Sequence, residues 1–202
     1  MYALCPMKWA GGSPGTLRGK AMDDIVKQAM LKWPNVPHCY GWLGLDARGN
    51  WYMRDDAAQA CGAFASGAPG AKGSLLKHEK LIDFIQRNYG CDDAGQWYFQ
   101  NGPQRVYVEL EATPWVWRVN DQGQVHAHDG RQAVCQRCVM DEHGWLYLQT
   151  SLGFGLVHTQ DVAQAANRVE AGDWTVEDAL RAELPGHYRY VTSPQAPSAR
   201  KA

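Results

Sequence analysis

The sequence predicts an α+β protein made of two similar units, each a meander of antiparallel β-hairpins with a packed helix. The main observation is a recurring turn signal, Asp or Asn with Gly three positions later, followed by strand-forming residues. In such a turn the Asp or Asn side chain accepts backbone hydrogen bonds, and Gly adopts the positive φ that the turn requires. The signal occurs four times, at Asp46–Gly49, Asp92–Gly95, Asn120–Gly123 and Asp141–Gly144.

The spacing of these turns indicates a duplication. The steps from Gly49 to Gly95 and from Gly95 to Gly144 are similar in length, while the segments between them differ, which argues against a solenoid. We therefore expect a first α+β unit over residues 34–103 and a second over residues 104–192. An N-terminal arm with a short helix (1–33) and a disordered tail (193–202) are expected to flank the two units.

Periodicity predicts the remaining elements. Apolar residues at helical spacing predict helices over 21–32, 74–89, 160–169 and 175–184. Ser74 is expected to cap the second helix, and Thr175 with Asp178 resembles a capping box at the start of the last. Strict alternation over 104–111 predicts a half-buried antiparallel strand with Glu109 and Glu111 on its solvent face. The Gly- and Ala-rich segment 57–73 is expected to be an irregular loop.

Composition excludes several classes of protein. The 20 Lys and Arg residues balance 21 Asp and Glu residues, so net charge gives no basis for nucleic-acid binding. No apolar stretch approaches the roughly 20 residues that a membrane helix needs. Residues 1–20 contain no compact apolar run, so we expect no secretory signal. We therefore expect a cytoplasmic protein that binds neither nucleic acid nor membrane. Its six cysteines are then expected to be buried thiols rather than disulfides.

A zinc site is one alternative, since five residues of zinc-binding types lie close together in the sequence: His126, His128, Cys135, Cys138 and His143. In a regular strand over 134–140, however, Cys135 and Cys138 would point to opposite faces. His143 occupies a turn position that other copies of the turn fill with unrelated residues, which indicates a solvent position. The main prediction therefore contains no metal and no cofactor.

No complete catalytic motif is present. Lys72 precedes Gly73 and Ser74, which is not the Walker order, and no strand is expected in front of them. Glu109 and Glu111 share a strand face but have no second feature of an acid/base site, and no nucleophile elbow occurs. The sequence therefore favours a non-enzymatic protein.

Several short motifs follow one another in a characteristic order: Trp33-Pro34, Cys39-x-Gly41, Gly49-x-Trp51-Tyr52, Leu76-x-His78-x-x-Leu81-Ile82-x-Phe84-Ile85, Gly95-x-Trp97-Tyr98, Gly102-Pro103, Val106-x-Val108 and Glu111-x-x-Pro114. In this order they resemble a family of bacterial proteins of unknown function with a duplicated α+β unit and a pleckstrin-homology-like second domain. The chain departs from that family at His78 and Ala112, where an Arg and a second acid are common, and by the 57–73 insertion.

The resemblance implies a nucleotide-like ligand bound between the two repeats, in signal transduction. Together with the polar residues of the neighbouring loops, it gives the expected ligand-binding set: Trp51, Lys72, Ser74, His78, Asn101, Gly102, Pro103, Arg105 and Glu111. The main prediction is thus a non-enzymatic ligand-binding regulatory protein. The alternatives are a scaffold that binds a protein partner without a small-molecule site, and the zinc-binding protein described above. The sequence predicts no oligomeric state.

Overall fold

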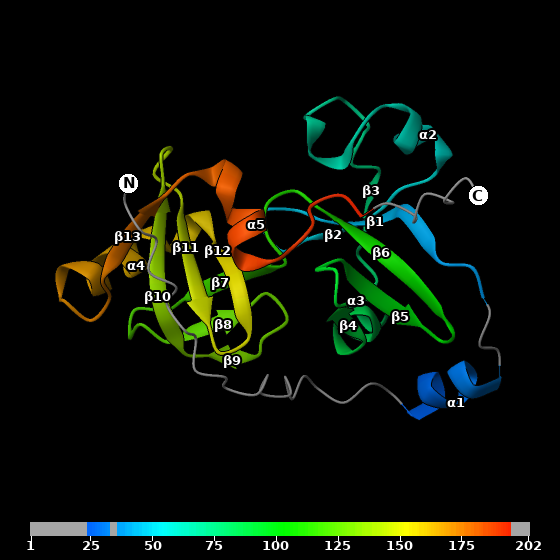
Figure 1. The fold of residues 1–202 in the computed structure, drawn as a ribbon, viewed down its shortest axis with the longest axis horizontal. Coiled ribbons are helices and arrows are strands. Elements are labelled where there is room, and N and C mark those ends of the chain that lie inside the picture. The colour runs from blue at the N-terminus through cyan, green and yellow to red at the C-terminus, as the bar shows by residue number, and fades with distance from the viewer. Residues whose placement is uncertain (1–23, 33–35, 195–202) are drawn as a thin grey trace, which may run out of the picture.

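The computed structural model describes residues 24–32 and 36–194, and these form a mixed α+β fold with two β-sheets (Figure 1). The strands of the first sheet are β1 (Cys39–Leu45), β2 (Trp51–Met53), β3 (Ser74–Leu75), β4 (Tyr89–Cys91), β5 (Trp97–Asn101) and β6 (Gln104–Leu110). Those of the second are β7 (Trp115–Val119), β8 (Val125–Ala127), β9 (Gln132–Ala133), β10 (Cys135–Asp141), β11 (Leu146–Thr150), β12 (Gly153–Val157) and β13 (Val176–Ala179).

Strand order confirms the predicted duplication. The first sheet has the order β3-β2-β1-β6-β5-β4, and the second, read from its other edge, has β9-β8-β7-β12-β11-β10-β13. In each sheet the central pair, β1 with β6 and β7 with β12, is parallel, and hairpins flank it on both sides. Each strand of the first sheet thus has a counterpart in the second, and β13 is an addition.

The four predicted turns have the predicted geometry. In the first, Gly49 N–H donates to the carbonyl of Asp46 (3.1 Å), and Asp46 Oδ1 accepts from the N–H groups of Arg48 (2.9 Å) and Asn50 (2.8 Å). The turns that begin at the equivalent residues repeat this pattern, and all four glycines have φ between +74° and +83°. The strand order makes the first turn equivalent to the third and the second equivalent to the fourth. The duplication is therefore right, but the comparison of Gly49, Gly95 and Gly144 as successive copies is wrong.

A fifth turn of the same kind joins β8 to β9. Gly130 N–H donates to the carbonyl of Ala127 (2.8 Å), Ala127 N–H donates to the carbonyl of Arg131 (2.8 Å), and Gly130 has φ +83°. Ala127 stands where the other turns have Asp or Asn, so the sequence signal does not detect it. The turn matters because it presents His128 toward the first sheet.

The helices partly follow the predictions. Helix α1 (Asp24–Lys32) and helix α4 (Val162–Glu170) confirm the helices expected over 21–32 and 160–169. The helix expected over 74–89 is shorter: α3 is Glu79–Arg87, and His78 rather than Ser74 caps it, with Nδ1 accepting from Leu81 N–H (3.2 Å). Ser74 and Leu75 instead form β3, because they pair with the edge of β2.

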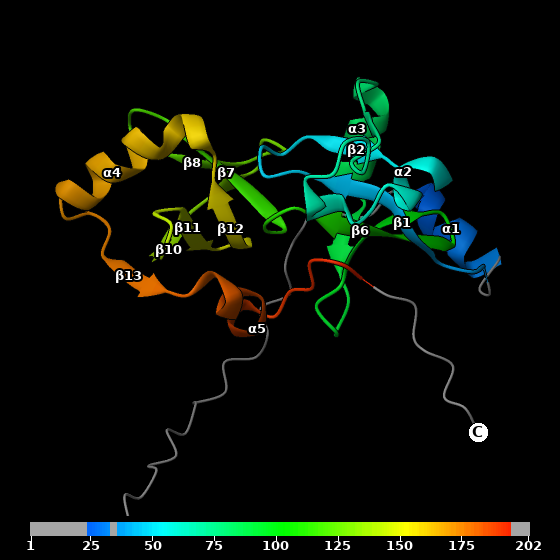
Figure 2. The ribbon, with the colours of Figure 1, turned by 90° about the horizontal axis from the view of Figure 1, so that it is seen from above.

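The helix predicted over 175–184 is wrong. Residues 176–179 form β13, which runs parallel to β10, and a 3-10 turn (Arg181–Glu183) and the short helix α5 (Leu184–Tyr188) follow it. Backbone hydrogen bonds to the otherwise open edge of β10 outweigh the weak helix propensity of a segment this short. After α5 the chain returns to the first sheet, where Val191 N–H donates to the carbonyl of Gly95 and Leu110 N–H donates to that of Thr192 (Figure 2).

The segment 57–73 is structured rather than irregular. It contains most of α2 (Asp56–Ala60) and a 3-10 turn (Phe64–Ser66). Buried Arg54 donates to the carbonyls of Ala71 (2.7 Å), Gly41 (3.2 Å) and Gly62 (2.6 Å), which fastens the segment to β1 and β2. Phe64 packs on Gly44, where a Cβ would lie 2.5 Å from its ring.

Strand β6 is more buried than its sequence pattern predicts. The strand is parallel to β1 and antiparallel to β5, and Tyr107 to Leu110 are all buried, so the prediction of a half-exposed antiparallel strand is wrong in part. Glu109 is 6% exposed, and burial raises the pKa of its carboxyl. Because β6 belongs to the first sheet, the sheets divide between Leu110 and Trp115, beyond the expected boundary after residue 103.

Three other expectations concern the chain as a whole. Residues 1–23 of the predicted N-terminal arm and residues 195–202 of the predicted tail lie outside the described residues. Within the described residues, no helix is long and apolar enough to cross a membrane. The predicted domain ranges stay a prediction, because two packed sheets do not by themselves define independent domains.

The two sheets share one continuous core. At their junction, here called the seam, the ring of Tyr89 packs against Trp51 (5.2 Å between centroids), Trp97 (4.8 Å) and Trp115 (5.6 Å). His128 completes this cluster, with its ring 5.9 Å from Trp51 and 5.6 Å from Trp115. The side chain of His128 also covers Gly49, where a Cβ would lie only 2.6 Å from His128 Cβ.

A turn glycine can be required for its positive φ or for the close contact that a missing side chain allows, and Gly49→Ala and Gly144→Ala separate these two roles. Both residues have positive φ (+83° and +77°), so each alanine should cost about 1–2 kcal/mol of backbone strain. Only Gly49 faces His128, since a Cβ at Gly144 meets nothing within 4 Å, so Gly49→Ala should cost about 1–3 kcal/mol more. Urea unfolding of the two variants measures this difference. Equal losses of stability would mean that the contact does not constrain the seam.

Candidate functional site

The candidate site is a pocket of about 420 Å³ at the seam. The first half of the chain lines it with residues of the first turn, of β2 and of the ends of two loops, and the second half closes it. The lining residues are Asp46, Ala47, Arg48, Asn50, Tyr52, Lys72 and Glu111 from the first half, and Trp145, Leu156 and Thr159 from the second. A ligand in this pocket would therefore contact both halves at once.

A lysine–glutamate pair forms the charged part of the pocket. Lys72 Nζ lies 2.7 Å from Glu111 Oε1, and Glu111 Oε2 accepts from Ala47 N–H (2.9 Å). The bond from Arg54 to the carbonyl of Ala71 fixes the backbone beside Lys72. Both charged side chains are about one third exposed (34% and 30%), and an ion pair with this exposure contributes only about 1 kcal/mol or less. Lys72 can therefore exchange Glu111 for a bound anion at small cost.

Asp46 shapes the pocket but has little capacity left for a ligand. Its carboxylate accepts from the N–H groups of Arg48 and Asn50 and from Asn50 Nδ2 (3.0 Å). The neighbouring ring of Tyr52 lies 5.8 Å from Lys72 Nζ, and burial together with the charge of Asp46 raises the pKa of its hydroxyl. Tyr52 is therefore a neutral aromatic wall with a hydrogen-bonding end.

Trp145 is the aromatic wall contributed by the second half. The guanidinium of Arg181 lies 3.8 Å above its ring, and Arg181 Nε donates to Asp141 Oδ2 (2.9 Å), which also accepts from the Tyr147 hydroxyl (2.8 Å). Burial raises the pKa of the Asp141 carboxyl, but hydrogen bonds from Trp145, Tyr147, His143 and Arg181 lower it by more. The net pKa is below the usual value, so this carboxylate is ionised at neutral pH. Trp145 as a whole residue is 38% exposed.

The structure brings together only part of the ligand-binding set expected from the sequence. Lys72 and Glu111 meet in the pocket, and Trp51 lies behind it in the seam. The others lie elsewhere: Ser74 is exposed on β3, His78 is an exposed helix cap, Asn101, Gly102 and Pro103 lie at the β5–β6 turn, and Arg105 stacks on Tyr98. Strand β6 has seven residues, so its length of about 23 Å separates that turn from Glu111.

The sequence reasoning named only Lys72 and Glu111 of the pocket residues, and Trp145 and Arg48 are two that it missed. Trp145 follows a turn glycine, as other aromatic residues do that prove to be core, and no local signal marks it as exposed. Arg48 occupies a turn position that varies among the copies, which predicts only that it faces solvent. Both residues reach the pocket only because one sheet packs on the other.

The zinc alternative fails for a different reason than the sequence suggested. Cys135 pairs with Thr150 and Cys138 with Leu148, because a bulge between Cys135 and Arg137 inserts one residue into β10. Since their partners are two positions apart, both cysteines face the same side, and the prediction of opposite faces is wrong. The histidines are nevertheless elsewhere, and within the described residues no group of three or more His, Cys, Asp or Glu is placed to hold a metal ion.

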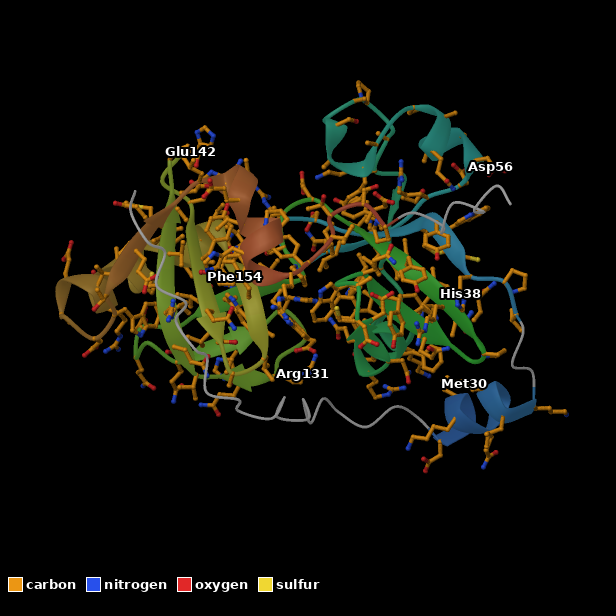
Figure 3. The ribbon with its side chains drawn as sticks, in the orientation of Figure 1. Met30, His38, Asp56, Arg131, Glu142 and Phe154 are labelled. Carbon is orange, nitrogen blue, oxygen red and sulfur yellow. The ribbon has the colours of Figure 1, made fainter. Side chains whose placement is uncertain are left out.

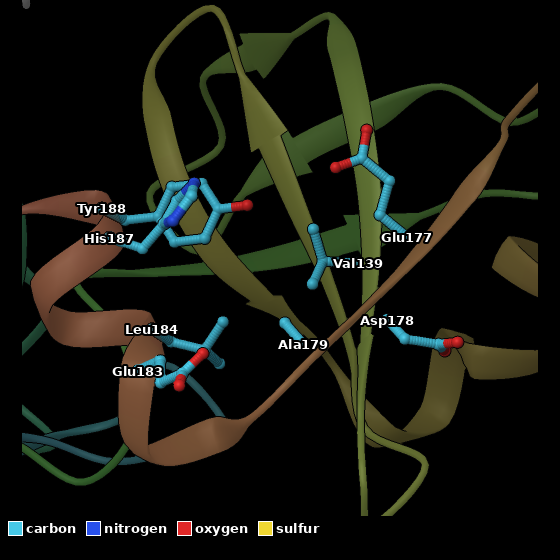
Figure 4. A pocket seen from close by; sticks show the side chains of 8 residues that line it. All are labelled: Val139, Glu177, Asp178, Ala179, Glu183, Leu184, His187 and Tyr188. Carbon is cyan, nitrogen blue, oxygen red and sulfur yellow. The ribbon is translucent and has the colours of Figure 1, made fainter. Parts of the chain in front are cut away.

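A second concave region lies beside β13 and α5 (Figure 4). This pocket of about 200 Å³ is lined by Val139, Glu177, Asp178, Ala179, Glu183, Leu184, His187 and Tyr188. Figure 4 shows its three carboxylates spread apart rather than converging, and Glu177 already faces Arg137 (3.7 Å). It is therefore a weaker candidate than the seam pocket.

Comparison with known proteins gives a family but no activity. A family profile described as "Protein of unknown function (DUF2946)" matches residues 22–197. The crystal structure of a DUF1285 family protein from Silicibacter pomeroyi DSS-3 is similar with a TM-score of 0.45 and 13% sequence identity, over 75% of this chain and 79% of that chain. No curated protein matches. The expectation of a family of unknown function is thus confirmed.

The cysteines should differ strongly in reactivity. Burial raises the pKa of Cys135 to about 11 and that of Cys138 to about 12, so very little thiolate is present at pH 8, whereas Cys61 is exposed. Iodoacetamide at pH 8, followed by mass spectrometry, should label Cys61 at least about tenfold faster than either. Equally fast labelling of Cys138 in the folded protein would contradict the buried position on β10.

Proposed function

We propose a ligand-binding function for this chain, which belongs to the family of proteins of unknown function whose profile matches residues 22–197. The ligand is a nucleotide-like molecule with a planar ring and an anionic group, and it binds in the seam pocket that holds Lys72 and Glu111. The protein acts as a non-enzymatic regulatory module. The observation that carries this proposal is a pocket of about 420 Å³ whose walls combine an exchangeable lysine with two aromatic rings from different halves.

The polar and apolar parts of the pocket suit the two parts of such a ligand. The ring of the ligand packs against Trp145 or Tyr52, since aromatic side chains accept any planar base. Its anionic group reaches Lys72, and the exposed side chain of Arg48 adds a second positive charge to the lining. Charge-assisted hydrogen bonds of this kind are stronger than those between neutral groups.

Glu111 sets the affinity in this proposal. Its carboxylate competes with the ligand for Lys72, while its other oxygen holds the backbone of Ala47. Removing the charge at this position without changing the shape should therefore favour an anionic ligand.

A regulatory role follows from the position of the pocket. Because the first half supplies Lys72 and the second supplies Trp145, a bound ligand favours the arrangement of the halves in which both contact it. Any ligand that binds only the folded state also raises its stability against unfolding.

The test compares AMP with adenosine by isothermal titration calorimetry on the full chain. AMP should bind, and adenosine should bind at least about tenfold more weakly because it lacks the charged group. Lys72→Ala should weaken AMP binding by about tenfold, and Glu111→Gln should strengthen it. Lys80→Ala, which removes an exposed lysine from α3 outside the pocket, is the matched control and should leave binding unchanged.

Two outcomes would overturn the proposal. One is the absence of AMP binding at millimolar concentration to the folded wild-type chain. The other is binding that Lys72→Ala and Lys80→Ala weaken equally, since this would indicate a general response to lost positive charge.

A further inference from the structure

The seam holds a second pocket, distinct from the one beside β13 and α5, and it shares no lining residue with the Lys72 pocket. Its volume is about 220 Å³. Strands β4 and β5 provide Tyr89, Gly90, Cys91, Trp97 and Tyr98, and the second half provides Trp115, Arg131 and Leu152. Figure 3 shows Arg131 at the junction of the two halves. Nothing in the proposed function above uses these residues.

Four nitrogen atoms, in the lining of this pocket and in the adjoining aromatic cluster, are buried and have no hydrogen-bond partner among the described residues. They are Trp51 Nε1, Trp115 Nε1, His128 Nε2 and Arg131 Nη2. His128 Nδ1 accepts from Val116 N–H (3.4 Å), which leaves the proton on Nε2, and burial lowers the pKa of this histidine to about 4, so the ring is neutral. All four atoms are therefore donors without an acceptor.

Such a concentration of unpaired donors is unusual. Native proteins pair about 90% or more of their buried polar groups, and each orphan costs about 1–3 kcal/mol. The four donors also belong to one contact network, since the rings of Trp51 and Trp115 both pack on His128, and Arg131 lies over Trp115. The common deficit is an acceptor, which a bound anionic oxygen would supply.

Arg131 and Trp115 connect these donors to the pocket, because both also line it. The guanidinium carbon of Arg131 lies 4.6 Å from the Trp115 ring centroid, and its Nε donates to Asp129 Oδ2 (2.6 Å), so one edge of the guanidinium is occupied. Gly153 lies beside Trp115 Nε1, where a Cβ would stand 3.0 Å away. A side chain at this position would press on the indole N–H, which is itself closed to solvent.

The other walls of the pocket are aromatic. Trp97 meets Trp115 edge to face, with ring centroids 5.3 Å apart and an angle of 84° between the planes. Tyr89, Tyr98 and Leu152 complete an apolar enclosure. A pocket of this size and lining suits one aromatic ring, and the cation at its border suits a carboxylate.

We propose that this second pocket binds a small aromatic carboxylate, whose ring packs against Trp97 and Trp115 and whose carboxylate accepts hydrogen bonds from Arg131 and from the Trp115 indole. Because the donors are closed to solvent, Arg131 turns from Trp115 toward the pocket as the ligand enters. The site is independent of the nucleotide-like site proposed above.

The duplication of the fold supports this assignment. Lys72 lies in the connection between β2 and β3, and Arg131 lies in the equivalent connection between β8 and β9. Trp145, which lines the pocket of Lys72, follows the turn between β10 and β11. Trp97, which lines the pocket of Arg131, follows the equivalent turn between β4 and β5. Each seam pocket thus combines a cation from one half with an aromatic wall from the other.

The test uses benzoate, with benzamide and acetate as matched probes that lack the charge and the ring. In ¹H–¹⁵N spectra of the labelled full chain at constant ionic strength, benzoate should shift the indole N–H resonance of Trp115 in a saturable manner. Benzamide and acetate should bind at least tenfold more weakly. Arg131→Gln should weaken benzoate binding at least tenfold, while Arg137→Gln, which changes an exposed arginine on β10, should alter it less than twofold.

Other results would overturn the proposal. One such result is a Trp115 resonance of wild-type protein that benzoate leaves unchanged up to about 20 mM, and another is benzamide binding as tightly as benzoate. In either case the donors are satisfied by buried water and no carboxylate site exists. The spectra of wild-type protein decide this even if Arg131→Gln fails to fold. Lys72→Ala should leave benzoate binding within twofold of wild type, so failure of the nucleotide-like site and failure of this site are distinguishable.

Discussion

The contact between Gly49 and His128 is the constraint on which the rest of the structure depends. It joins a turn of the first sheet to a turn of the second, and it is possible only because Gly49 has no side chain. With the turns in contact, Trp51, Tyr89, Trp97 and Trp115 pack into one aromatic cluster instead of forming two separate cores. The two seam pockets border this cluster, so their shapes follow from how closely the turns approach.

The two seam pockets each contain a cation that is paired with a carboxylate. Lys72 is paired with Glu111 and Arg131 with Asp129, so neither cation is left without a counter-charge in the unliganded chain. The pairs differ in burial, since Glu111 is 30% exposed but Asp129 only 5%. A more buried pair holds its geometry more firmly because solvent screens it less. Glu111 is therefore easily displaced by a ligand anion, whereas Asp129 orients Arg131 and leaves its remaining edge for the ligand.

The sequence predicted what local chemistry decides and missed what sheet pairing decides. The four Asp or Asn turns were predictable because each turn contains its own acceptor and its own glycine. The turn at Ala127 lacks the acceptor, and residues 176–179 become a strand only because β10 offers an open edge. For the site, Lys72 and Glu111 were named as separate candidates, but their pairing and the role of Trp145 depend on packing between sheets.

Duplication explains why a chain of this size has two seam pockets and why they differ. In the first half the connection between β2 and β3 is long and contains the 57–73 segment, which Arg54 fastens and which brings the one-third exposed Lys72 to its pocket. In the second half the equivalent connection is a tight turn, which delivers His128 and Arg131 to the aromatic cluster. A long connection can present its cation to a large polar ligand. A short one places its cation against the core, where only a small and largely apolar ligand fits.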